Sequence, residues 1–285
     1  MRIRIWGSRG SVAAPGPDTV RYGGNTPCVE VRLRDGTILV LDAGTGIRPL
    51  GRTLAKERPA VLHLLLSHLH LDHLVGLPFF DPVYMSGLEL HLWGPRSPVY
   101  TLGESIERYM SPPLFPIGLN DLPARVLLHD APSEPWAIGT ATLMAEPVSH
   151  NGPTLGYRIE EDGAAFAYIP DHEPARGVDI GSVASEWLSG FSLAHRADLL
   201  LHDAQYTPAE YPAKIGFGHS SLTHVVELAR RAEVQRLLLF HHDPAHSDEY
   251  LEEMEAEARR LWPGREPPVL AREGMELTVG AGVTL

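Results

Sequence analysis

Apolar residues along this chain either alternate with polar ones or gather in short runs, and both patterns predict β-strands. Charged and apolar side chains alternate over Arg2–Trp6, which indicates a first strand. Cys28–Leu33 and Thr37–Leu41 are two further strands joined across Asp35-Gly36, a dipeptide typical of hairpin turns. The remaining strands are predicted over Val61–Leu66, Leu88–Trp93, Thr140–Glu146, Thr154–Ile159, Ala164–Ile169, Leu199–His202 and Leu237–Phe240.

Helices are predicted in the intervals between these strands. They cover Ile47–Lys56, Gly103–Met110, Leu222–Ala232 and Ser247–Leu261. Because strands cluster in both halves of the chain and helices alternate with them, we expect an α/β fold in which two sheets pack between helices. Apart from one strand and one short helix, the proline-rich residues 78–140 are expected to be irregular. No linker rich in Gly, Ser or charge divides the chain, so residues 1–285 are interpreted as one domain.

Composition limits the partners and the compartment of the protein. A net charge of −12 over 285 residues argues against a protein that binds nucleic acid mainly through a basic surface. Cys28 is the only cysteine, so no intrachain disulfide can form, and it is expected to be a small buried residue. The start, Met1–Trp6, is too short and too charged for a signal peptide, and no stretch approaches the roughly 20 apolar residues of a membrane span. We therefore expect a cytoplasmic protein that makes no use of a membrane.

The most informative stretch for chemistry is Ser67-His68-Leu69-His70-Leu71-Asp72-His73. It follows the apolar run Val61–Leu66 directly, so a buried strand ends in three imidazoles and one carboxylate. Neutral imidazole and carboxylate are the usual ligands of zinc and of other first-row metals. A solvated His-rich loop is the alternative, but such loops rarely follow a buried strand with this spacing. The stretch therefore predicts a metal site.

Three later strand ends also carry candidate ligands. His150 follows the strand that ends near Glu146, Asp171 follows Ala164–Ile169, and His241 with His242 follows Leu237–Phe240. A single histidine at such a position would more often be structural, but three positions together with the cluster favour one shared site. Because neighbouring side chains leave a strand end in opposite directions, only one of His241 and His242 should face it.

The motif His-x-His-x-Asp-His at His68, His70, Asp72 and His73 resembles that of the metallo-β-lactamase fold superfamily. The later His, Asp and His motifs match His150, Asp171 and His241 in the same order. The resemblance implies a four-layer αββα sandwich with two metal ions between the sheets. It places one metal on His68, His70 and His150 and the other on Asp72, His73 and His241, with Asp171 as the bridge. Zinc is the first candidate, and manganese or iron also fit.

Two C-terminal motifs narrow the resemblance to the ribonuclease Z and cyclic-phosphate phosphodiesterase branch. Leu201-His202-Asp203-Ala204 resembles its His-Glu-Ala-Thr motif, and Gly218-His219-Ser220-Ser221 its Gly-His-Ser-Thr motif. That branch implies that His219 protonates the leaving group and that Asp203 orients it, although Asp is shorter than Glu and its reach stays open. The spacing of the branch also favours His241 over His242 as the last ligand. Asp171 stands where true β-lactamases usually have Cys, and His70 where flavo-diiron proteins have an acid.

The expected substrate is a small phosphodiester, with cyclic nucleotides among the candidates. The arm that grips tRNA in this branch is absent, because His150 and Asp171 are only 21 positions apart, and the net charge also argues against tRNA. Residues 78–140 are expected to form one wall of the pocket.

A hydroxide shared by the metals would attack phosphorus, with Asp72 orienting or deprotonating it. A thioester or lactone hydrolase and a non-catalytic metal sensor are the alternatives, and a homodimer stays open.

Overall fold

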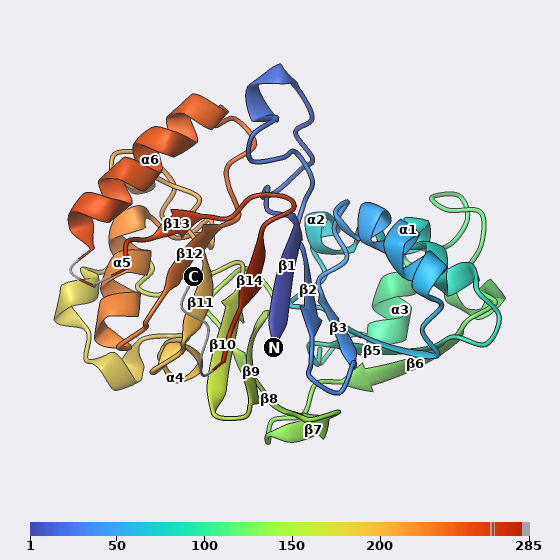
Figure 1. The fold of residues 1–285 in the computed structure, drawn as a ribbon. Coiled ribbons are helices and arrows are strands. Elements are labelled where there is room, and N and C mark those ends of the chain that lie inside the picture. The colour runs from blue at the N-terminus through green and yellow to red at the C-terminus, as the bar shows by residue number, and fades with distance from the viewer. Residues whose placement is uncertain (263, 265, 281–285) are drawn as a thin grey trace.

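A computed structural model describes residues 1–262, 264 and 266–280 of the chain. Two seven-stranded β-sheets pack face to face, and helices cover the outer face of each sheet (Figure 1). The expected αββα sandwich is confirmed. The strands of the first sheet, in spatial order, are β14 (Glu276–Thr278), β1 (Arg2–Gly7), β2 (Cys28–Arg32), β3 (Ile38–Leu41), β4 (Val61–Leu65), β5 (Glu89–Gly94) and β6 (Arg125–Asp130). Those of the second are β13 (Val269–Leu270), β12 (Leu237–Phe240), β11 (Leu199–Asp203), β10 (Ala164–Ile169), β9 (Leu155–Glu161), β8 (Ala141–Pro147) and β7 (Trp136–Ile138).

The two sheets share one pairing scheme. In the first sheet, β14 to β3 pair antiparallel and β3 to β6 pair parallel. In the second, β7 to β10 pair antiparallel and β10 to β13 pair parallel. Because parallel strands present their carboxyl ends at the same edge of a sheet, each sheet gathers several strand ends at one edge.

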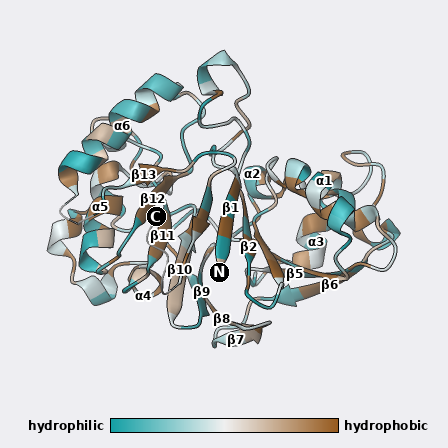
Figure 2. Ribbon diagram, in the orientation of Figure 1, coloured by the Kyte–Doolittle hydropathy of each residue, from teal (hydrophilic) through white to brown (hydrophobic). Residues whose placement is uncertain are grey.

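Helices bury the outer faces because their apolar residues fall on one side. On the first sheet lie α1 (Ile47–Glu57), α2 (Leu71–Leu74) and α3 (Leu102–Glu107), and on the second α4 (Phe191–Ala194), α5 (Leu222–Arg231) and α6 (Asp248–Leu261). Figure 2 shows the polar outer face of α6, as expected for an amphipathic helix. The apolar inner faces of the sheets meet in a separate core that includes Ile3, Leu39, Phe166 and Leu201.

The expectation that residues 78–140 are irregular apart from one strand and one helix was wrong. This segment also contains β6 and β7, and the short edge strands β13 and β14 were missed as well. β6 is half exposed along most of its length and β14 has three residues, so neither carries the buried apolar run that predicts a strand. The other expected strands and helices are present, and their ends differ from the expected ones by at most three residues. Among the described residues, no helix is long and apolar enough to span a membrane.

A hydrogen bond between the sheets lies just beneath the histidine motif. The hydroxyl of Tyr157, on β9, donates to the carbonyl of Leu66, the residue that follows β4, at 2.7 Å. Tyr157 is fully buried, so no water can replace this donor.

Replacing Tyr157 with Phe should lower the free energy of unfolding by about 1–2 kcal/mol, because the buried carbonyl of Leu66 loses its donor. Urea unfolding measures the change. Tyr100→Phe is the matched control, since Tyr100 is exposed and should change stability by less than about 0.5 kcal/mol. Equal stabilities of the two variants would contradict this account.

Candidate metal centre and active site

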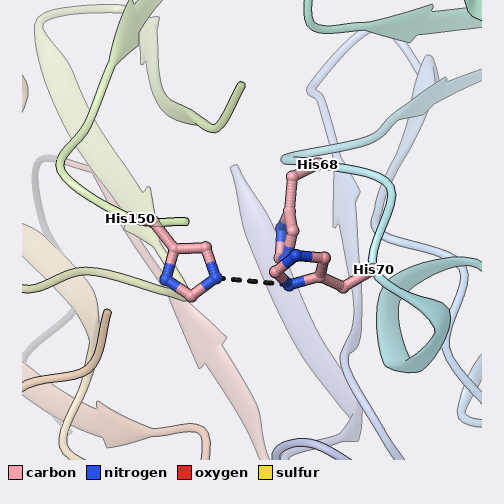
Figure 3. A group of neighbouring side chains, drawn as sticks. All are labelled: His68, His70 and His150. Atoms are coloured by element: carbon pink, nitrogen blue, oxygen red, sulfur yellow. Dashed lines mark hydrogen bonds between the residues drawn. The ribbon is translucent and has the colours of Figure 1, made fainter. Parts of the chain in front are cut away.

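The first group of candidate ligands consists of His68, His70 and His150. Their ligand nitrogens all lie within 4.8 Å of one another. His68 and His70 come from the loop after β4, and His150 approaches from the loop after β8 in the other sheet (Figure 3). The Nε2 atom of His150 lies 3.3 Å from Nδ1 of His70. His68 and His150 are buried and His70 is exposed, so this group adjoins the surface.

The second group consists of Asp72, His73, Asp171 and His241, which also lie within 4.8 Å of one another. Asp72 and His73 belong to α2, Asp171 follows β10 and His241 follows β12. The Nε2 atom of His241 lies 3.2 Å from Oδ2 of Asp72 and 3.4 Å from Nε2 of His73. The structure thus brings together all seven residues that the sequence predicted as metal ligands.

Asp171 lies between the two groups. Its Oδ2 atom is 3.7 Å from Nε2 of His150 and 3.8 Å from Nε2 of His68, while it is 3.3 Å from Nε2 of His241. Its Oδ1 atom is 3.0 Å from Nε2 of His73. A carboxylate in this position can contact a cation in either group.

The donor set fits divalent metal ions. The Nε2 atom of His68 and the Oδ1 atom of Asp171 are buried and make no hydrogen bond, which is costly unless another partner binds there. Burial holds the pKa of His68 well below its ordinary value, so its lone pair is available to a metal. Burial alone would raise the pKa of Asp171, but the neighbouring His241, His73 and His68 hold it well below its usual range.

Hydrogen bonds on the far side of each ring fix the orientation of the histidines. His73 donates from Nδ1 to Asp42 at 2.8 Å, and His150 donates from Nδ1 to the carbonyl of Gly218 at 2.6 Å. His241 donates from Nδ1 to Oε1 of Gln205 at 2.9 Å. Each Nε2 atom therefore points at the centre, as in metal sites where an outer partner sets the ring orientation.

Three residues in this outer layer were missed by the sequence analysis. Asp42 follows β3, Gln205 follows β11, and Glu173 accepts hydrogen bonds from the backbone N–H groups of Gly216 and Gly218 at 2.9 Å each. Of the three, only Asp42 has a sequence feature that could have identified it, because it is a carboxylate at the end of an apolar strand. Gln205 and Glu173 have no distinguishing spacing.

His219 and Asp203 form a hydrogen-bonded pair beside the centre. His219 donates from Nδ1 to Oδ2 of Asp203 at 2.8 Å, so the shorter Asp side chain reaches its partner. Asp203 is fully buried and also accepts from the backbone N–H groups of His172 and Gln205. Burial would lower the pKa of His219, but carboxylates led by Asp203 raise it to about 9. These carboxylates therefore favour the protonated form of the imidazole.

Two other histidines lie outside the centre. His242 points away from it and donates from Nε2 to the carbonyl of Ala271 at 2.8 Å. His172 is fully buried and shares a hydrogen bond of 2.8 Å with His202, so it does not line the pocket.

A surface depression of about 190 Å³ opens beside the first group. It is lined by His68, Leu69, His70, Pro95, Ser97, Ser105, Asn151, Gly152 and Pro153. Pro95 and Pro153 also line a groove of about 520 Å³ that lies next to it. Of the segment expected to wall the pocket, only residues 95–105 border this depression.

Comparisons with known proteins identify the family of the chain. Residues 37–242 match the model of the beta-lactamase superfamily domain. The uncharacterized protein Rv1339 of Mycobacterium tuberculosis is 31% identical over 249 residues, or 82% of this chain and 84% of that protein. Ribonuclease Z of Metallosphaera sedula is 28% identical over 271 residues, or 81% of this chain and 86% of the enzyme. The metallo-beta-lactamase fold protein YhfI from Bacillus subtilis aligns with a TM-score of 0.70 at 16% identity, over 98% of this chain and 99% of its own.

If Asp171 contacts both metals, Asp171→Ala should lower the content of both together, whereas His150→Ala should chiefly release one. Elemental analysis of protein from metal-replete medium measures this, with two equivalents expected for the unchanged chain. His242→Ala is the control and should keep both equivalents, since His242 points away from the centre. Loss of the same single equivalent from the Asp171 and His150 variants would remove Asp171 from the bridging position.

Asp42→Asn should weaken metal binding by about 10–100-fold, because loss of an outer hydrogen-bond partner misorients a ligand. The amide also cannot accept all the hydrogen bonds that the carboxylate accepts. Competition with a chromogenic chelator gives the affinity. Asp35→Asn, in the exposed turn between β2 and β3, is the control, and an equal effect of both substitutions would refute this role for Asp42.

Proposed function

The chain belongs to the beta-lactamase superfamily and is a metal-dependent hydrolase, and from this premise we propose that it is a phosphodiesterase acting on a small phosphodiester. The observation that carries the proposal is the pair His219 and Asp203, which lies against both ligand groups. His219 Nδ1 is 3.9 Å from Oδ2 of Asp171, and its ring stacks on that of His241 with centroids 4.8 Å apart. A proton donor in this position suits cleavage of a bond to a poor leaving group.

In this proposal, His68, His70 and His150 would hold one divalent metal ion, and Asp72, His73 and His241 would hold a second, with Asp171 between the two groups. Zinc suits this set of imidazole and carboxylate donors, and manganese or iron are alternatives. When bound, such ions supply Lewis acidity toward phosphoryl oxygens and make water acidic enough to attack near neutral pH.

The residues of the chain then divide the remaining work. Asp72 accepts a hydrogen bond from the backbone N–H of Ser11 at 2.8 Å, which fixes the carboxylate that orients the attacking water. Asp203 holds Nδ1 of His219, so the other ring nitrogen, Nε2, delivers the proton to the departing oxygen. The backbone N–H groups of His172 and Gln205 hold Asp203 in turn, which keeps the donor in one orientation.

The shape of the site favours a small substrate. The depression of about 190 Å³ next to His68 and His70 has room for one small group, and cyclic nucleotides are among the candidates. β9 and β10 are joined by Asp162 and Gly163 alone, so no arm extends between His150 and Asp171. Together with the net charge of −12, this supports a substrate other than tRNA.

The proposed function is tested by measuring how the loss of turnover in His219→Ala depends on the leaving group of the substrate. With a poor leaving group, such as the ribose oxygen of a cyclic or linear nucleotide, turnover should fall by about 10²-fold or more, because proton donation is lost. With bis-p-nitrophenyl phosphate, whose leaving group needs little protonation, the loss should stay below about tenfold. Initial rates for the metal-loaded protein give both numbers.

His172→Ala serves as the control for removing a buried imidazole nearby, and its losses should not depend on the leaving group. Equal losses of His219→Ala on both substrates would exclude the general-acid role. A purified, metal-loaded protein that turns over a thioester or a lactone but no phosphodiester would replace the proposed function with one of these activities.

A further inference from the structure

One of the two lysines of the chain shares an aromatic neighbour, Tyr206, with the proposed acid. Lys214 follows the short helix Tyr211–Ala213, in the segment that leads to His219. Its Nζ atom lies 5.6 Å from the ring centre of Tyr206 and 5.3 Å from that of Phe217. Both distances are within the range of a cation–π contact, so two aromatic rings hold the ammonium group in place.

These rings connect Lys214 to the site. The ring of Tyr206 is buried and meets the ring of His219 edge-on, with centroids 6.0 Å apart. Phe217 precedes His219 by two residues and is 55% exposed, so it lies at the surface next to the site. Tyr206 thus contacts both the ammonium group and His219, and Lys214 itself is half-buried.

The charge of Lys214 is not neutralised by a carboxylate. Among the ion pairs of the described residues, none includes Lys214 within 4.0 Å. Arg176 differs from Lys214, because it donates to Asn151 at 2.7 Å and lies 3.7 Å from Glu173.

The nearby carboxylates already have donors of their own. Glu173 accepts from Tyr211 and two backbone N–H groups, and Glu210 accepts from Thr207 and His246. Aromatic faces orient a cation without cancelling its charge, whereas carboxylates would cancel it. In a protein with a net charge of −12, an uncompensated cation at this place is available to an anion from outside.

We propose that Lys214 binds the anionic oxygens of the substrate and so selects charged phosphodiesters over neutral esters. This inference rests on the proposed function. Lys214 attracts the phosphodiester toward His219 and holds it there, while the chemical step depends on the metal ligands and His219. Loss of the charge therefore weakens substrate binding and leaves the rate of the bound complex nearly unchanged.

The test compares Lys214→Met, which keeps a long apolar stem, with Lys214→Arg, which keeps the charge. Lys56→Met is the matched control, because Lys56 is exposed on α1 and is the only other lysine. With bis-p-nitrophenyl phosphate and metal-loaded protein, Lys214→Met should raise KM about fivefold or more and change kcat by less than about twofold. Lys214→Arg should restore most of the affinity, and Lys56→Met should match the unchanged chain.

Two further measurements separate a charge effect from a change of shape. Raising the salt concentration should increase the KM of the unchanged chain more steeply than the KM of Lys214→Met. Salt screens the attraction between the ammonium group and the substrate, and the variant lacks this attraction. Calorimetric titration with adenosine 5′-monophosphate should show an affinity for Lys214→Met that is lower by a similar factor. Metal content and unfolding temperature establish that each variant is folded and loaded.

An unchanged KM for Lys214→Met, or a raised KM with the same salt dependence as the unchanged chain, would overturn the proposal. The same holds if Lys214→Arg behaves like Lys214→Met, since the effect would then come from packing on Tyr206 and Phe217. If the unchanged chain turns over no phosphodiester, the proposed function fails by itself. The titration with adenosine 5′-monophosphate still decides whether Lys214 binds an anion.

Discussion

A single buried carboxylate, Asp42, ties together the parts of the protein that form the centre. Its oxygens accept hydrogen bonds from the backbone and the hydroxyl of Ser67, from Nδ1 of His73 and from the hydroxyl of Tyr168, at 2.7–2.8 Å. A charge without exposure to water is tolerated only when such donors surround it. Because Ser67 precedes the histidine motif and Tyr168 belongs to the opposite sheet, the carboxylate fixes the motif relative to both sheets.

Much of the candidate site could be predicted from the sequence because its residues follow recognisable apolar runs. His68, Asp171 and His241 each come within three residues of the end of a strand, and parallel strands bring such ends to one edge. The outer layer was not predictable in the same way. Gln205 and Glu173 act through hydrogen bonds that depend on the positions of loops, and no periodicity in the sequence marks those positions.

The alternating direction of side chains along a strand does not predict the backbone conformation at its end. The sequence indicated that His241 and His242 point in opposite directions, and the structure places them so. It did not indicate that Asp42 and His241 both adopt left-handed backbone conformations, with φ of 60° and 59°. Non-glycine residues seldom do so, and such strain persists where the surrounding contacts fix it. At each of these strand ends, the backbone turns a side chain into the space between the sheets.

The edge strands β6 and β14 were missed for a different reason, since half-exposed edges carry no continuous apolar run.

The order of the cluster along the chain has a consequence for its assembly during synthesis. The ribosome releases His68 to His73 first, and the first group is complete only when His150 has emerged. The second group needs Asp171 and then His241, which follows β12, the strand that pairs with β11. From the release of His68 to that of Asp171, the growing chain thus presents imidazoles without the carboxylate that lies between the groups. The full set of ligands exists only once His241 has been synthesised, so a cation that needs both groups is bound after that point.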